Sequence, residues 1–446
     1  MKIKTISRTE EDYVRKSKLD IVKVHRNRDP VVHPFERARE YARAVVATKL
    51  DKIFAKPFVG ALDGHKDGVY CMSSVRSHLV PFISGSCDGE LRVWDLSTKH
   101  CVWHAIAHEG FVRGVAPDVA GNAFYSCGDD KVIKLWALQH QLEEEGEVSP
   151  LNVIHSSHSM TSIDHHWVDS QFATSGDVVS IWDGTRAQPI NTYKWGADSV
   201  LCVRYNPAEA CLLASTGNDR SVCLYDLRSS LPMRKMVMAM NANKVAWNPR
   251  EPMNFTLASE DYNLYTFDMR KLDHALMIHK DHVGAVMDVA YSPTGREFVS
   301  ASYDRTVRIF NVTSGKSREA YHTKRMQRVF CSAFSADAEY VLSGSDDTNV
   351  RIWRSVASKS GAVDSGRAER KKQYMQSLKK RFAHMPEIKR MNSDKKLPKA
   401  IRKAKGIMHV QRLSQHRKTE NRIKHSKEGS VILPTERKKA VIKELE

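Results

Sequence analysis

The sequence lacks the features that mark metal-binding, disulfide-bonded or membrane-spanning chains. Its eight cysteines include no Cys-x-x-Cys pair, and several lie in apolar runs such as Leu201-Cys202-Val203. We therefore expect no zinc site or disulfide framework, only small buried residues in a reducing compartment. No window approaches about 18 apolar residues, and the amino-terminal segment has no apolar stretch typical of a signal peptide. We expect an intracellular, soluble protein with no membrane partner.

Patterns of catalytic and cofactor sites are also missing. The sequence contains no Gly-rich phosphate-binding loop and no arrangement of nucleophile, base and oxyanion donors outside the repeats described below. It shows no RNA-recognition sheet, zinc finger or KH loop. We therefore predict a protein that is not an enzyme, takes no cofactor or small-molecule substrate, and does not read nucleic-acid bases.

Acidic residues are scarce in one part of the chain only. Lys and Arg number 70 against 52 Asp and Glu, a formal net charge of +18. Residues 354–446 hold 27 of the basic and 9 of the acidic residues, so they account for the whole excess. Such asymmetry is typical of a contact with nucleic acid or another acidic partner, carried by a neutral scaffold.

A repeat of about 43 residues runs through the neutral part. Segments like that from Ser86 to Asp95 have an aspartate near a turn, then alternating apolar residues and an aromatic. The seven copies are separated by 42, 46, 43, 42, 43 and 43 residues and end at Trp94, Trp136, Trp182, Tyr225, Phe267, Phe310 and Trp353. This is the period of a four-stranded propeller blade, so we predict an all-β fold with seven blades and a basic α-helical C-terminal extension.

Polar residues recur in phase with the repeat. The aspartates before each aromatic are expected to fix a tight turn; they are Asp88, Asp130, Asp177, Asp219, Asp261, Asp304 and Asp347. In the first two copies, His65 with Ser84 and His108 with Ser126 complete a set that resembles the structural His-Ser-Asp-Trp network of WD repeats (WD40). A hydrolase triad is the alternative, but recurrence with the blade period favours the structural interpretation.

Ring closure can also be predicted from the sequence. The apolar run from Pro57 to Leu62 precedes the first Gly-His turn and has no blade of its own, so we expect it to complete the last blade. The predicted divisions are an N-terminal extension (1–50), the propeller (51–353) and a basic helical C-terminal domain (354–446). The run from Glu36 to Leu50 is compatible with a helix, or with a solvated extension.

The basic tail has helical periodicity. A first helix is expected from about Arg367 to a stop at Pro386, and a second segment opens at Leu397-Pro398. We predict that the tail contacts RNA phosphates and assembling particles, with a solvated charged tail as the alternative. The candidate residues are Lys379, Lys380, Arg381, Lys389, Arg390, Lys395, Lys396, Arg402, Lys403, Lys405, Arg422 and Lys424.

A protein-binding rim is predicted where the first strand of each blade begins. Aromatic and arginine residues there are candidate anchors, although ordinary surface decoration is the better explanation for any single one. The candidates are Phe111, Arg113, Trp195, Lys324, Arg325 and Arg328.

Beyond the WD repeat, the chain resembles the Sof-like family of nucleolar WD-repeat proteins. The resemblance rests on Asp29-Pro30 with His33-Pro34-Phe35, on Ile163 to Trp167, on Glu260 to Arg270, and on tail stretches such as Asn421 to Lys427. It implies a nucleolar and nuclear component of the small-subunit processome, needed for processing 18S pre-ribosomal RNA. The implied partners are pre-ribosomal RNA, small nucleolar ribonucleoprotein components and other processome proteins.

Two short motifs suggest a different partner. Asp226 with Arg228 and Asp268 with Arg270 resemble the Asp-x-Arg boxes by which some WD proteins dock on the adaptor of a cullin-RING ubiquitin ligase. The resemblance implies a substrate receptor as an alternative function. Asp and Arg are also common turn residues, and this interpretation stays open.

Overall fold

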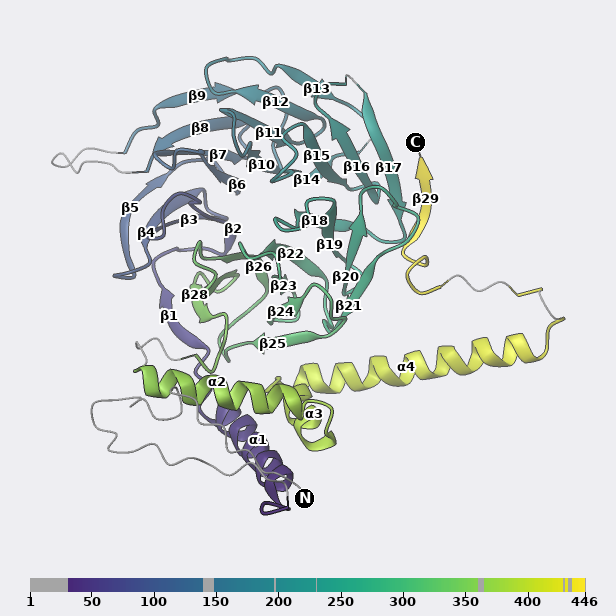
Figure 1. Ribbon diagram of the computed structural model, residues 1–446. Coiled ribbons are helices and arrows are strands. Elements are labelled where there is room, and N and C mark those ends of the chain that lie inside the picture. The colour runs from purple at the N-terminus through teal and green to yellow at the C-terminus, as the bar shows by residue number, and fades with distance from the viewer. Residues whose placement is uncertain are drawn as a thin grey trace, which may run out of the picture. The chain divides into compact units, whose positions relative to one another are not determined.

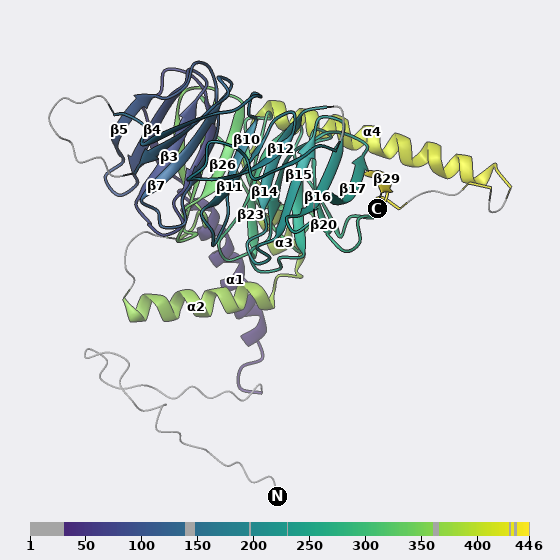
Figure 2. The same ribbon diagram turned by 90° about the horizontal axis from the view of Figure 1, so that it is seen from above.

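The computed structural model describes residues 31–138, 148–195, 198–229, 231–359, 365–427, 430–431 and 435–445. Its strands form seven antiparallel sheets arranged in a ring, which confirms the predicted seven-bladed propeller (Figure 1). The turned view shows the blades packed side by side around that ring (Figure 2). Asp29 and Pro30, and most of the predicted N-terminal extension, lie outside the described residues.

The first three blades follow one another along the chain. Blade 1 comprises β2 (Val69–Ser74), β3 (Pro81–Ser86), β4 (Glu90–Asp95) and β5 (His100–Ile106). Blade 2 comprises β6 (Val112–Pro117), β7 (Ala123–Gly128), β8 (Val132–Ala137) and β9 (Asn152–His155). Blade 3 comprises β10 (Ser162–His165), β11 (Gln171–Ser175), β12 (Val179–Asp183) and β13 (Asn191–Tyr193). The second strands, such as β3, are almost wholly buried between neighbouring blades, which explains their continuous run of small and apolar residues.

The next three blades repeat the pattern. Blade 4 comprises β14 (Val200–Tyr205), β15 (Leu212–Gly217), β16 (Ser221–Asp226) and β17 (Pro232–Met238). Blade 5 comprises β18 (Ala242–Trp247), β19 (Asn254–Ser259), β20 (Asn263–Asp268) and β21 (Met277–Lys280). Blade 6 comprises β22 (Val286–Tyr291), β23 (Glu297–Ser302), β24 (Val307–Asn311) and β25 (Ser317–Tyr321).

Blade 7 closes the ring with strands from both ends of the propeller. It comprises β26 (Val329–Phe334), β27 (Tyr340–Ser345), β28 (Val350–Arg354) and, from before blade 1, β1 (Phe58–Leu62). β1 pairs antiparallel to β28, with Leu62 opposite Val350, and both side chains are buried. The predicted closing strand is therefore confirmed, and the pairing removes a free sheet edge.

The repeated aspartates hold the turn between the second and third strands. In five blades the Asp side chain accepts a hydrogen bond from the backbone N–H two residues later, as Asp304 does from Thr306 at 3.0 Å. In six blades the residue after the Asp has a positive φ, and Gly89 is the one glycine among them. Blade 3, which is one residue shorter here, has no such residue.

The C-terminal strand β29 (Val441–Leu445) adds a fifth strand to blade 4, beside β17 (Figure 1). Lys235 pairs with Leu445, and Val237 pairs with Lys443. Ala440 is buried in the apolar core shared by blades 4 and 5. The sequence analysis did not predict this strand.

Segments from both ends of the chain form a separate helical unit. It contains α1 (Glu36–Ile53), α2 (Gly366–Arg381) and α3 (Pro386–Ser393), and its core includes Leu378 and Ile388. The first tail helix was expected to run to Pro386, but α2 ends at Arg381. Pro386 instead begins α3, where its missing N–H costs no hydrogen bond.

Compact packing groups the chain differently from the predicted divisions. Of the described residues, those within 31–56 and 356–395 form the helical unit, whereas those within 57–355 and 396–445 form the propeller unit. The propeller unit includes α4 (Lys399–Lys424), which begins directly after Pro398 in the predicted second segment. Ile401 is the one buried residue of this helix. None of the described helices is long and apolar enough to cross a membrane.

Candidate binding surfaces

Side chains of each His-Ser-Asp-Trp set form hydrogen bonds with one another inside their own blade. In blade 2, His108 lies 2.9 Å from Asp130 through Nδ1 and 2.8 Å from Ser126 through Nε2, and the Trp136 indole donates to Ser126. In blade 1, His65 and Trp94 share Ser84, but the carboxylate near His65 is Glu90. Asp88, predicted for that role, bonds Ser86 instead.

Burial keeps these imidazoles neutral. It lowers the pKa of His65 to about 4 and also lowers the pKa of His108, against the opposing effect of the nearby carboxylates. Each serine hydroxyl is held by an indole N–H, so it is not placed as a nucleophile in a cleft. The arrangement therefore supports the structural interpretation.

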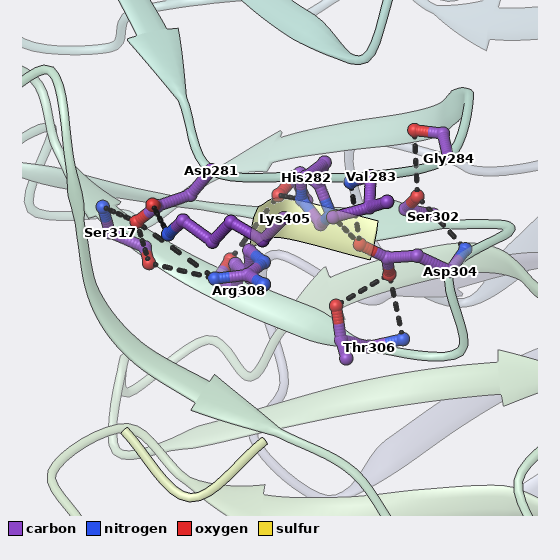
Figure 3. A network of polar contacts seen from close by, with 11 residues as sticks. Asp281, His282, Val283, Gly284, Ser302, Asp304, Thr306, Arg308, Ser317 and Lys405 are labelled. Carbon is purple, nitrogen blue, oxygen red and sulfur yellow. Dashed lines mark hydrogen bonds and ion pairs between the residues drawn. The ribbon is translucent and has the colours of Figure 1, made fainter. Parts of the chain in front are cut away.

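Blade 6 contains a third set that sequence inspection missed. His282 binds Asp304 at 2.9 Å (Figure 3). It also binds Ser300 at 2.7 Å, although Phe310 stands where Trp would complete the set. This set lacks two signals of the first two sets, because His282 follows Asp281 and not a small residue, and Phe310 replaces the terminal Trp. Spacing alone could have found it, since His282 precedes Asp304 by the same 22 residues that separate His108 from Asp130.

The structure brings some of the predicted rim residues together in one group. Tyr70 stacks on Phe111 with 6.3 Å between ring centroids, and the Arg113 guanidinium lies 4.8 Å from the Phe111 ring. Phe330 contacts both Tyr70 and Tyr303. Arg328 lies 5.4 Å from Tyr303. We call Tyr70, Phe111, Arg113, Tyr303, Arg328 and Phe330 the aromatic rim cluster; it joins blades 1, 2, 6 and 7.

The other rim candidates lie apart from this cluster. Trp195 contacts Lys235 of blade 4, whose ammonium donates to the Trp195 carbonyl at 3.3 Å. Lys324 and Arg325 are exposed in the loop between β25 and β26. Their roles in protein binding stay predictions.

The two Asp-x-Arg boxes lie at equivalent positions, after the third strands of neighbouring blades. Asp268 accepts two hydrogen bonds from the Arg270 guanidinium, at 2.8 and 3.0 Å, and these bonds fix the position of the guanidinium. Asp226 accepts from the backbone N–H of Arg228 at 3.0 Å. The Arg228 and Arg270 side chains are 73% and 68% exposed, so both can be reached by a partner.

The predicted RNA-binding residues are distributed over the helical unit and the propeller unit, and in each unit some of them form ion pairs. In the helical unit, Lys379 pairs with Asp51, and Arg381 pairs with Glu40 at 2.8 Å. In the propeller unit, Lys405 pairs with Asp281 at 2.5 Å. The exposed members include Lys380, Lys389, Arg390, Arg402, Lys403, Arg422 and Lys424. Lys396 fixes the start of α4 through its carbonyl, which accepts from His322 at 2.9 Å, while Lys395 precedes it in the helical unit.

Buried charges that the sequence analysis overlooked connect the first strands of neighbouring blades. Asp164 accepts from Arg204 at 3.0 Å and from the backbone N–H of Tyr205 at 2.8 Å. Asp288 accepts from the backbone N–H of Ser332 and pairs with Lys244. These carboxylates satisfy backbone groups across blade boundaries, so we interpret them as structural.

The comparisons with known proteins agree with the repeats and the tail. The Sof1-like domain family matches residues 355–441, and the WD domain, G-beta repeat family matches five segments between residues 56 and 354. DDB1- and CUL4-associated factor 13 of Xenopus laevis is 48% identical over 442 residues, 99% of each chain. The chain belongs to the Sof1-like family of WD40 proteins.

Other members of the Sof1-like family show the same full-length similarity. The human DDB1- and CUL4-associated factor 13 is 48% identical over 445 residues, again 99% of each chain. Protein SOF1 of Saccharomyces cerevisiae is 42% identical over 467 residues, 99% of this chain and 94% of its own. The five repeat matches omit the segments that end at Trp182 and Phe267, where the structure nevertheless has complete blades.

No group of His, Cys, Asp and Glu that could hold a metal ion occurs among the residues the structure describes. All eight cysteines are unpaired thiols.

Proposed function

We propose that this Sof1-like protein is a non-enzymatic scaffold in ribosome biogenesis, acting in 18S pre-ribosomal RNA processing within the small-subunit processome of the nucleolus. Its full-length similarity to Protein SOF1 and the Sof1-like match over the tail support this proposal. The propeller offers the aromatic rim cluster to proteins, and the basic tail contacts pre-ribosomal RNA and small nucleolar ribonucleoprotein components.

The exposure of α4 is the observation that carries the RNA contact. This helix has 26 residues, and all its basic side chains are exposed. Lys403, Arg417, Arg422 and Lys424 form no ion pair with the residues that the structure describes. Exposed, unpaired cations along a helix release counterions when they meet phosphates, which favours binding without sequence choice. Lys379 and Arg381 of α2, by contrast, already hold carboxylates of α1.

Charge neutralisation tests this proposal better than tail deletion, because deletion would also remove α2 and α3 from the helical core. We expect K403Q/R417Q/R422Q/K424Q to weaken single-stranded RNA binding on the order of a hundredfold at low salt. The slope of log affinity against log salt should become shallower by about 0.7 for each lost contact. Fluorescence anisotropy over a salt series measures both quantities.

A matched control removes four cations from the propeller turns, as K66Q/K131Q/R220Q/R305Q. All four side chains are exposed, so the change in net charge is the same. Equal losses in the two quadruple variants would show that the contact is not made by α4. In cells, the α4 variant should also leave pre-ribosomal particles, whereas the control variant should remain bound.

A substrate receptor of a cullin-RING ubiquitin ligase is the second candidate function. The relatives named DDB1- and CUL4-associated factor 13 favour it, as do the exposed arginines of two neighbouring boxes. Arginines with an exposed guanidinium often dominate binding energy at protein interfaces.

Replacing both box arginines tests this second function. We expect R228A/R270A to weaken binding to DDB1 about tenfold or more in a surface plasmon resonance assay. The control is R186A, because Arg186 also follows a third strand, lies near Asp183 and is 68% exposed. If R228A/R270A and R186A bind DDB1 as the unchanged protein does, the ligase function is wrong.

A further inference from the structure

A cavity of about 330 Å³ lies between α4 and blade 6. Its α4 side is formed mainly by Arg402, Lys405, His409 and Arg412, and its propeller side by Lys280, Asp281 and His282. We call it the α4–blade 6 pocket. Its volume is in the range of small-ligand sites, and one charged group with its sugar or ring would fit inside.

The lining of the α4–blade 6 pocket is strongly cationic. Four Lys and Arg side chains face it, and Asp281 is the one acidic residue among those that line it. Lys280 is partly neutralised by Glu436, which lies 2.5 Å from its ammonium. Arg402 forms no ion pair within the described part of the chain, whereas Arg412 interacts electrostatically with Glu436 and helps to lower the pKa of that carboxyl. The pocket therefore keeps a net positive charge, because its four cations outnumber the two carboxylates, Asp281 and Glu436, that interact with them.

Asp281 forms no ion pair with Arg402 or Arg412, because its oxygens bind other groups. One oxygen accepts from the Ser317 backbone N–H at 2.9 Å and from its hydroxyl at 2.7 Å, while the other binds Lys405 (Figure 3). The fully buried Arg308 guanidinium lies 3.9 Å from the same carboxylate. In this network Lys405 holds α4 on blade 6, whereas Arg402 and Arg412 do not bind Asp281 and can contact a ligand.

We propose that the α4–blade 6 pocket binds a phosphate ester group. Guanidinium groups form paired hydrogen bonds with phosphate oxygens, and a partly enclosed site strengthens such charge-assisted bonds. The group can come from a soluble polyphosphate or from an RNA backbone. The RNA source rests on the proposed function, whereas the soluble source does not.

The test compares a double variant of α4 with a double variant of the propeller turns, both in the full-length protein. R402Q/R412Q removes two cations from the pocket, and K66Q/R220Q removes two exposed cations from propeller turns that do not line it. Both variants keep Lys405 and Asp281, which hold the helix in place. The probes are inositol hexakisphosphate, measured by isothermal titration calorimetry, and oligouridylate RNA, measured by fluorescence anisotropy.

We expect R402Q/R412Q to lose about tenfold or more in affinity for at least one probe, while K66Q/R220Q loses about twofold or less for that probe. Selective loss with inositol hexakisphosphate identifies a soluble ligand, and this result stands even if RNA does not bind. Selective loss with RNA alone identifies a backbone phosphate. Equal losses in both variants, or no binding of either probe to the unchanged protein, would overturn the proposal.

Discussion

Acidification from about pH 7 to about pH 4.5 is expected to remove about 2 kcal/mol of folding free energy through His279 alone. This imidazole is fully buried between Phe298 and Phe310. Its Nδ1–H donates to the Ser314 carbonyl at 2.8 Å, and its Nε2 accepts from Thr266 at 3.1 Å. Burial lowers its pKa to about 4, against a smaller opposing effect of the Ser314 carbonyl.

The direction of this change in folding free energy follows from the difference in proton binding between the unfolded and the folded chain. The unfolded chain, with an imidazole pKa of about 6.5, binds more protons than the folded chain between about pH 6.5 and about pH 4. The contribution of His279 to the folding free energy is therefore fully present above about pH 6.5 and is lost as the pH falls from there to about pH 4. Other buried histidines such as His65 add to the loss.

The variant H279Q isolates the contribution of this residue. Chemical unfolding at a series of pH values should show a lower free energy of unfolding at neutral pH but a shallower decline on acidification. The control is H104Q, which changes an exposed imidazole on β5. Parallel curves for H279Q and the unchanged protein would contradict the assignment.

Truncation of Phe382 is expected to destabilise the helical unit by about 3 to 5 kcal/mol. The Phe382 side chain is 9% exposed and meets Tyr41 of α1 edge-on, with 5.8 Å between ring centroids. In F382A, amide hydrogen exchange should therefore accelerate in α1, more than three hundred residues away in the sequence, while the propeller strands keep their protection.

Phe54 provides a control of the same residue type in the same unit. It follows α1 and is 70% exposed, so F54A removes the same atoms without opening a cavity. Exchange in α1 should then be nearly unchanged. Equal acceleration in F54A and F382A would show that Phe382 is not part of a core that unites the two ends.

The repeated part of the fold could be predicted because each blade carries its own signal. The aspartate turn, the alternating strands and the terminal aromatic recur at nearly constant spacing, and one leftover strand before blade 1 matched one missing strand in blade 7. Blade 3 kept its four strands despite the shortened turn, because packing against its neighbours does not depend on that residue.

Pairings between distant segments could not be predicted in this way. β29 has a short apolar run that fits many sheet edges, and nothing local directs it to β17. The tail showed helical periodicity and the run from Glu36 to Leu50 was compatible with a helix, but neither pattern reveals which buried faces of α1 and α2 meet. For the same reason the tail candidates could not be divided beforehand into paired residues such as Lys379 and exposed ones such as Lys403.

The helical unit can be completed only late in the synthesis of the protein. α1 leaves the ribosome early, whereas the α2 residues that cover it follow more than three hundred residues later. At about 5 to 20 residues per second, its apolar face waits roughly 15 to 60 s for a partner. A chain released before Ile388 would keep that face uncovered. The helical unit can therefore fold only after the ribosome has translated the propeller and reached the tail.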